Sequence, residues 1–312
     1  MMILILDGKT AVSGATRGVD LCLRTVIPSL FPFFVLSGLL TSAFLGSKFP
    51  VSLKCFGVPQ GAETLAIAGF LGGYPVGAQN IAAAYRNGSL SRSTAQRMLG
   101  FCNNAGPSFL FGMIGPMFPS AKYAWALWGI HIVSALLVGF LLTGETEKQV
   151  SIPKYPPPGL SQALRQAISV MGSVCGWIIL FRIILAFLNR WVFWLLPQTW
   201  QVAVTGLLEL SNGCVALMTV EDIGWRFLIC AGILGFGGLC VTMQTISVTA
   251  DLSLRYYFPG KLLQTAFSIL LCRFFIPYRT EFVVILLIYC IFLGLILRKM
   301  QNNSSIPLLI GV

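Results

Sequence analysis

The chain has 312 residues, of which 56% are hydrophobic and only 10% are charged, whereas a soluble domain carries roughly 25% charged residues. So few charges cannot cover a water-facing surface, which excludes an ordinary soluble globular protein. The formal net charge is +11, but Lys and Arg are scattered in short loops between apolar runs, where positive charge sets membrane orientation. The composition therefore predicts an integral membrane protein in contact with lipids, and it gives no support for a nucleic-acid partner.

The Cys and His residues argue against a metal site and against a catalytic triad. The nine Cys residues are all separated, without a C-x-x-C pair, and the single His is His131. Metal sites need clustered ligands, and a hydrolase needs a nucleophile with a base beside it. We therefore expect no metal, no cofactor and no enzymatic activity.

Residues 1–143 are predicted to form an N-terminal membrane repeat. Residues 7–24 mix charged with small and apolar residues, which is typical of an amphipathic helix at the membrane interface. Residues 25–46 carry no charge and are numerous enough to cross a bilayer. Further uncharged runs cover residues 64–85, 98–121 and 123–143.

A polar, Pro-rich linker at residues 144–160 leads to the second half of the chain. Residues 161–312 are predicted to form a C-terminal membrane repeat. Its apolar runs cover residues 161–189, 191–208, 227–250, 261–275 and 282–297. We therefore predict an all-α fold, a polytopic transmembrane helix bundle of about 8 spans (range 7–10) with broken or re-entrant helices and two pseudo-repeats.

Three stretches interrupt the apolar runs with glycine, proline or amide residues. The first two lie in residues 69–108, at Gly72-Gly73-Tyr74-Pro75 and at Asn103-Asn104-Ala105-Gly106-Pro107-Ser108. The third lies in residues 206–214, which contain Glu209, Ser211 and Asn212. In lipid, the backbone groups freed at a break must be satisfied by protein, water or a bound solute. Each break is therefore a candidate binding site, while close helix packing through small residues is the simpler alternative.

The two halves share a motif. Gly72-Gly73 is followed after five residues by Gln79, and Gly237-Gly238 is followed after five residues by Gln244, within residues 235–246. Transporters often pair two repeats whose broken helices meet near the membrane midplane. A basic polar turn follows each motif, and the second of these turns ends at Lys261. Because the two turns carry similar charge, they do not decide between an inverted and a parallel repeat, of which we favour the inverted one.

Glu209 is one of the few ionisable residues inside an apolar run, together with Glu63, Arg182 and Arg273. A charge at the centre of a membrane helix is costly, so it usually faces a cavity or a partner. Arg182 is the candidate partner, and a structural ion pair with it is the alternative to a functional carboxylate at Glu209.

The predicted substrate site is a polar pocket inside the bundle. Helix N-termini carry partial positive charge, and amide side chains donate and accept hydrogen bonds without the desolvation cost of a full charge. Both features suit the carboxylates of a small anion. The predicted substrate-binding residues are Gly72, Gly73, Tyr74, Pro75, Gln79, Asn103, Asn104, Ser108, Glu209, Ser211, Asn212, Gly237, Gly238 and Gln244.

The ordered set of motifs resembles the YlbJ family of sporulation integral membrane proteins, also called SpoVV. In chain order the motifs are GF-x-GGYP-x-GAQ, FCNNAGP-x-F, GLLELSNGC and GFGGLCVTMQ. Members of this family carry a nucleoside-recognition gate domain. The resemblance implies a multi-pass cell-membrane transporter or facilitator of a small anionic metabolite. It further implies dipicolinic acid as the solute and, in a spore former, the outer forespore membrane as the location.

Two alternatives stay open at the level of the sequence. Within the same class, the chain is a transporter of nucleosides or of other small solutes. From another class, it is a non-transporting membrane scaffold or spore-maturation factor. A coupling ion, a second copy of the chain, and other sporulation membrane proteins are the further candidate partners.

Overall fold

The computed structural model describes residues 6–44, 50, 52–144, 149–153, 159–276 and 280–302. Within these ranges every element is a helix, apart from an isolated bridge between Gln60 and Gln149. Four helical stretches in the described residues are long and apolar enough to cross a membrane: Gly8–Leu40, Ala121–Leu141, Leu160–Trp191 and Ile223–Val248. The all-helical class is therefore confirmed, whereas the span count of about 8 stays a prediction.

The first half of the chain forms a continuous N-terminal helix, a group of short helices and one long helix. Its α-helices are α2 (Gly8–Leu21), α3 (Ile27–Phe44), α4 (Glu63–Gly72), α5 (Val76–Arg86), α6 (Arg92–Cys102) and α7 (Ala121–Leu141). A π-helical segment, Cys22–Val26, joins α2 to α3, and a second one, Ser108–Ile114, follows α6. The helix predicted over residues 7–24 therefore continues into the next apolar run, because residues 21–27 contain no glycine or proline to end it.

The second half begins with the longest helix and then breaks repeatedly. Its α-helices are α8 (Leu160–Trp191), α9 (Gln198–Leu208), α10 (Leu210–Ala216), α11 (Ile223–Phe236), α12 (Gly238–Val248), α13 (Tyr257–Leu271) and α14 (Thr280–Asn302). The predicted run over residues 191–208 contains the 11-residue α9, which is about 16 Å long and too short to cross the hydrocarbon core. Short helices of this kind must meet other short helices end to end inside the bundle.

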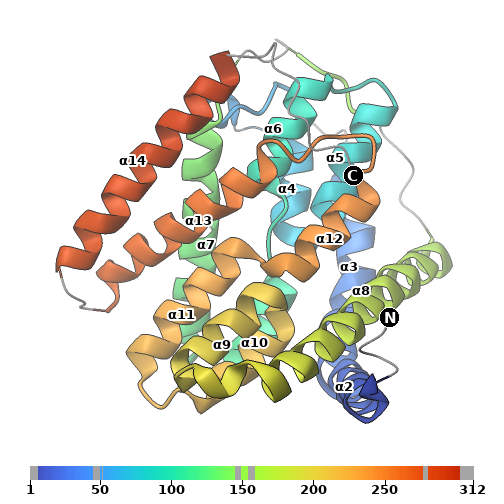
Figure 1. Ribbon diagram of the computed structural model, residues 1–312. Helices are drawn as coiled ribbons and strands as arrows, with labels where there is room; N and C mark the ends of the chain where they lie inside the picture. Colours follow the sequence, from blue (N-terminus) through green and yellow to red (C-terminus); the bar gives the residue numbers. More distant parts are fainter. Residues whose placement is uncertain are drawn as a thin grey trace.

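The interior is divided into two hydrophobic cores. The upper core contains Leu65, Ile81, Leu99 and Tyr257 and lies among α4, α5, α6 and α13. The lower core contains Val26, Leu110, Ile178, Cys214 and Ala231 and lies among α3, α7, α8, α10 and α11. In Figure 1 the α4–α6 group lies in the upper part of the molecule and α9–α11 in the lower part, with α13 running across between them.

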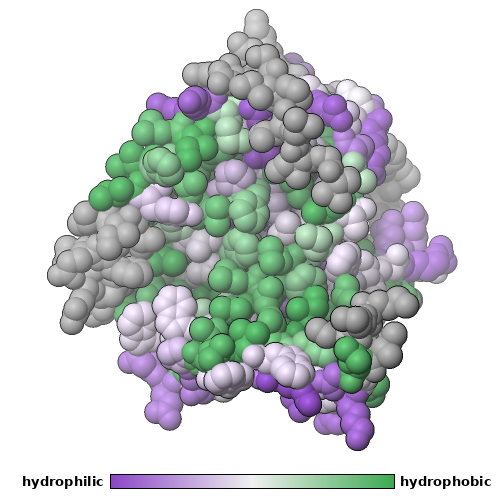
Figure 2. All heavy atoms as spheres, viewed as in Figure 1, coloured by the Kyte–Doolittle hydropathy of each residue, from purple (hydrophilic) through white to green (hydrophobic). Residues whose placement is uncertain are grey.

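The surface has an apolar band of the kind that faces lipid. Figure 2 shows hydrophobic side chains spread across the middle of this face, with hydrophilic ones gathered along its lower edge and near its top. Large apolar side chains are also exposed along α8, at Leu164, Ile168, Leu180 and Ile184. A soluble protein does not expose apolar surface on this scale without a partner, so the surface agrees with an integral membrane protein.

Arg86, at the end of α5, connects the two halves outside the breaks. Its guanidinium donates to the Asp251 carboxylate, at 3.2 Å between Nε and Oδ2, and to the Val248 carbonyl at 2.7 Å. Arg92 donates to the Asp251 carbonyl at 3.1 Å. The hydrogen bond from Arg86 lowers the pKa of Asp251 below its ordinary value. The turn after α5 is therefore tied to the loop between α12 and α13.

Candidate functional site

The first break, at Gly73, lies directly against the second break, at Gly106. Gly73 follows α4 with a φ of +74°, and a Cβ atom on it would lie 2.9 Å from the backbone nitrogen of Gly106. Only glycine combines this left-handed backbone with so close an approach. Tyr74 and Pro75 complete the break through a cis peptide bond, and Pro75 is the N-cap residue of α5. The first two breaks therefore meet backbone to backbone.

We expect Gly73→Ala to lower the free energy of unfolding by about 2–4 kcal/mol, as left-handed strain and a backbone clash add together. Gly88 provides the matched control, because its φ is +76° and a Cβ atom on it would meet nothing within 4 Å. Gly88→Ala adds the strain alone and should cost about 1–2 kcal/mol. Thermal unfolding of both purified variants in detergent measures the difference. Equal losses would mean that the contact between the breaks has no energetic weight.

Gly237 brings the second half of the chain to the first break. It lies between α11 and α12 with a φ of +82°, and a Cβ atom on it would lie 2.9 Å from the Tyr74 hydroxyl oxygen. That hydroxyl donates to the carbonyl of Leu234 in α11, at 3.3 Å. Gly238 in turn approaches the third break, since its Cβ atom would lie 3.3 Å from the backbone nitrogen of Leu210. The Gly237-Gly238 motif is thus a fourth break, and all four are in contact.

Glu209 closes the third break, between α9 and α10. Its Oε1 accepts the Ser211 N–H at 3.0 Å, and its Oε2 accepts both the backbone N–H and the side-chain amide of Asn212 at 2.6 Å. The carboxylate is 2% exposed and caps the positive N-terminus of α10. Among the described residues no ion pair joins Glu209 to Arg182. The suggested structural pair does not form, because both carboxylate oxygens are taken by amides of the following turn.

A small cavity of about 40 Å³ lies where the first three breaks meet α12; we call it the central cavity. Its other walls are apolar and come from α3 and α8, with Leu30, Phe34, Val174 and Ile178. This volume holds a water molecule or a single carboxylate group, not a whole aromatic dicarboxylate. The described conformation is therefore closed around the cavity. The predicted site residues that line it are Gly73, Tyr74, Ser108, Glu209, Ser211 and Gln244.

The remaining predicted residues lie around the central cavity but not in its wall. Gln79 is on α5, and its half-buried side chain is not part of the lining. Asn212 borders a different, larger cavity. Gly72, Pro75, Gly237 and Gly238 shape the backbone of the breaks, and Asn103 and Asn104 are buried behind them.

The position of Lys261 in the fold was predicted wrongly from the sequence. This residue was expected in the basic turn after the second motif, but it lies inside α13 and is 1% exposed. Its Nζ donates to the Asn103 carbonyl at 2.6 Å, to Oδ1 of Asn104 at 3.2 Å and to Oε1 of Gln264 at 2.9 Å. Helix α13 begins at Tyr257, because Pro259 suits the first turn of a helix. The buried ammonium therefore ties the second break to the second half of the chain.

Two tyrosine rings flank the ammonium of Lys261. Its Nζ lies 5.6 Å from the ring centroid of Tyr74 and 5.8 Å from that of Tyr257. No carboxylate pairs with it in the described part of the chain. Tyr74 also lines the central cavity, so its ring stands between the ammonium and the cavity. A spacing signal was available in the sequence, since Lys261, Gln264 and Ser268 recur at helical intervals along one face of α13.

Hydrogen bonds continue from Lys261 through a buried polar layer, which we define as Asn103, Asn104, His131, Lys261 and Gln264. The Gln264 amide donates to Oδ1 of Asn104 at 2.9 Å and to the His131 carbonyl at 3.3 Å. Nε2 of His131 accepts a hydrogen bond from the backbone N–H of Ala105, at 3.1 Å. Asn103 and Asn104 directly follow Cys102, which belongs to the upper core, and directly precede Ala105, which belongs to the lower core. The layer therefore lies at the boundary between the two cores.

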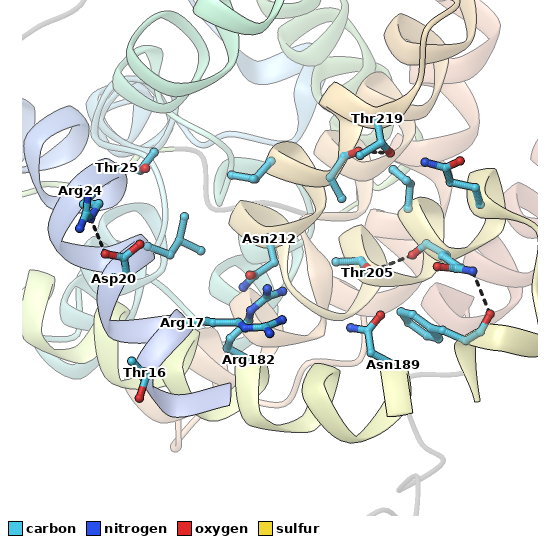
Figure 3. A pocket seen from close by; sticks show the side chains of 17 residues that line it. Thr16, Arg17, Asp20, Arg24, Thr25, Arg182, Asn189, Thr205, Asn212 and Thr219 are labelled. Atoms are coloured by element: carbon cyan, nitrogen blue, oxygen red, sulfur yellow. Dashed lines mark hydrogen bonds and ion pairs between the residues drawn. The ribbon is translucent and has the colours of Figure 1, made fainter. Parts of the chain in front are cut away.

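A second, larger cavity of about 950 Å³ lies beside α10, among α2, α8 and α9 (Figure 3). We call it the vestibule and define it by Arg17, Arg182, Asn189, Thr205 and Asn212. The Asn212 side chain borders the vestibule and donates to Glu209, which borders the central cavity. Only the first turn of α10 therefore separates the two cavities.

The chain is similar to a curated protein of Bacillus subtilis (strain 168), the sporulation integral membrane protein YlbJ. The two are 25% identical over an alignment 311 positions long, gaps included, and the alignment covers 83% of this chain and 76% of the relative. No family model matches the chain, and no solved structure matches it. The motifs GGYP, NNAGP, ELSNG and GFGGL, on which the resemblance depends, form the four breaks that are in contact around the central cavity. The similarity supports placing the chain in the YlbJ family of sporulation integral membrane proteins.

Proposed function

We propose that the protein is an integral membrane transporter or facilitator that passes a small anionic solute through the junction of its four helix breaks. One observation carries the proposal: breaks from both halves of the chain meet at one buried cavity, into whose largely apolar wall they bring Ser108, Glu209 and Ser211. Non-helical backbone at membrane depth is tolerated where it is buried in protein or lines a cavity. Discontinuous helices that meet near the midplane are a recurrent way to bind a solute in transporters.

The charges around this route favour an anion as the solute. The Lys261 Nζ lies 5.6 Å from the ring centroid of Tyr74, which lines the central cavity, and Arg17 and Arg182 border the vestibule. The carboxylate of Glu209 is held by three N–H groups of α10, which reduces its repulsion of an anion. Because the similar protein is a sporulation protein, we propose dipicolinic acid as the solute during spore formation. The location would then be the outer forespore membrane, with the chain as a multi-pass protein.

The two halves are proposed to be pseudo-repeats. Helix α4, a left-handed glycine and α5 follow one another in the first half, as α11, a left-handed glycine and α12 do in the second. Gln79 and Gln244 occupy equivalent positions after these glycines. Only Gln244 lines the central cavity, so the two repeats would contribute unequally to the site.

Uptake of labelled dipicolinate into proteoliposomes that contain the purified chain tests the proposal. We expect saturable uptake that pyridine dicarboxylates inhibit and nucleosides do not. Inhibition by nucleosides alone would favour the nucleoside alternative. A correctly inserted protein that moves neither class of solute would overturn the proposal in favour of a membrane scaffold.

Ser108→Ile is expected to abolish this uptake, because the branched side chain would fill the central cavity, whose volume is about 40 Å³. Ser108→Ala is the matched control at the same position, since it leaves the cavity open and should retain at least half of the uptake rate. Initial uptake rates are compared at equal amounts of inserted protein. Normal uptake by Ser108→Ile would show that the solute does not pass through the central cavity.

A further inference from the structure

We propose that Arg17 and Arg182 form a binding site in the vestibule for a small dicarboxylate anion, where the solute is held before it reaches the central cavity. The proposal rests on the function proposed above and adds the place and the residues of first binding. Figure 3 shows the two guanidinium groups side by side, Arg17 coming from α2 and Arg182 from α8, below the side chain of Asn212. Both residues also border the adjoining cavity of about 440 Å³ along the same two helices.

Close packing of α2 against α8 forces these two like charges together. Gly14 and Gly18 lie one helical turn apart on α2, and a Cβ atom on either would lie 2.9 Å from the Cα of an isoleucine in α8. This is the small-x-x-x-small contact that lets membrane helices approach closely. Arg17 lies within the same turn, and Arg182 has its Cβ 3.3 Å from the Cβ position of Gly18. The contact that joins the helices therefore also sets the distance between the two arginines.

Neither arginine has an acidic partner among the described residues. The carboxylate of Asp20, which also borders the vestibule, pairs with Arg24, and Asp7 pairs with Arg190 at 3.0 Å. The structure shows no ion pair for Arg17 or Arg182 in its described part. The two guanidinium groups repel each other, the Glu209 carboxylate offsets this only in part, and a bound anion would relieve the remaining repulsion.

The chemistry of the site favours a solute with two carboxylates. A guanidinium binds a carboxylate through two parallel N–H···O bonds, so two guanidinium groups match two carboxylate groups. Uncharged polar side chains complete the wall, with Thr205, Asn189 and Asn212 among them. A volume of about 950 Å³ accommodates a small dicarboxylate together with its water. Asn212 then leads from this site to Glu209 and the central cavity.

Binding of dipicolinate to the purified chain in detergent, measured by titration calorimetry and by thermal unfolding, tests the site. We expect Arg17→Gln and Arg182→Gln each to weaken dipicolinate binding at least tenfold, and each to raise the unfolding temperature of the solute-free protein because a repulsion is removed. Pyridine-2-carboxylate, with a single carboxylate, should bind more weakly to the wild type and lose less in either variant. Arg165→Gln is the matched control, because Arg165 is an exposed arginine of α8 that borders neither cavity, and it should change dipicolinate affinity less than twofold.

The outcomes separate this inference from the proposed function. If dipicolinate binds in a manner that depends on Arg17 but is not taken up into proteoliposomes, the binding site is supported and the transport proposal is overturned. If both Arg17→Gln and Arg182→Gln bind and take up dipicolinate as the wild type does, the proposed binding site is overturned and the transport proposal is retained. Displacement of dipicolinate by anionic lipid in nanodiscs, with arginine-dependent retention of that lipid, would assign the pair to a lipid head group and overturn the inference.

Discussion

Lys261→Met is expected to lower the free energy of unfolding by about 3–5 kcal/mol and to abolish solute uptake. Methionine keeps the length of the side chain but donates no hydrogen bond. The Asn103 carbonyl and the side-chain oxygens of Asn104 and Gln264 would each lose a donor within 3.2 Å. Buried acceptors left without a partner cost more than the bond itself contributes. Chemical denaturation in detergent and proteoliposome uptake measure the two effects.

Two further variants separate a structural role of Lys261 from a role in transport. Lys122→Met replaces an exposed lysine at the start of α7 and should change neither stability nor uptake. Lys261→Gln keeps a side-chain N–H donor but carries no charge, so it should lose less stability than Lys261→Met. Uptake should stay absent in this glutamine variant if the ammonium acts on the solute. Recovery of uptake together with stability would show that Lys261 only holds the breaks together.

Glu209→Ala should cost about 2 kcal/mol of stability and eliminate uptake, because α10 loses its only side-chain cap. Three N–H groups at the start of this 7-residue helix would lose their acceptor, next to both cavities. Glu209→Gln keeps one acceptor oxygen and should fall between the alanine variant and the wild type in both measurements. Unfolding temperature and initial uptake rate are the readouts.

Asp222→Ala is the control for loss of an acidic N-cap. Asp222 caps α11 by accepting the Trp225 N–H at 2.7 Å, but it is exposed and lines neither the central cavity nor the vestibule. Its loss should cost about 1 kcal/mol and leave uptake unchanged. If Glu209→Ala and Asp222→Ala had the same effect on uptake, Glu209 would have no function beyond capping.

The sequence was sufficient to find the breaks, because the residues that cause them are local signals. Gly73, Gly106 and Gly237 each occur where the backbone must turn or be approached closely, and no distant residue is needed to recognise them. The lengths of the helices were harder to predict. Two short helices joined at a glycine, such as α11 and α12, have the hydropathy of one span, so an apolar run does not reveal whether it crosses the membrane.

The arrangement of the candidate site was predicted only in part. Tyr74, Ser108, Glu209 and Gln244 come from three breaks and one helix, and the structure brings them to one cavity, but the sequence could not say which breaks touch. Lys261 was assigned to a loop because a lysine at the edge of an apolar run has the same pattern as a topology signal. Its partners lie about 160 residues away in the sequence, beyond the reach of local periodicity.

An interior made of an upper and a lower core can tilt at the polar layer between them. Apolar contacts hold each core together, whereas the continuous helix α7 and hydrogen bonds such as that from the Ala105 N–H to His131 connect one core to the other. Exchanging such bonds for bonds to water costs little net free energy, whereas separating packed apolar side chains costs much more. Rocking of the two ends about this polar layer would expose the central cavity to one side of the membrane and then to the other. Alternating access would then need no unfolding of either end.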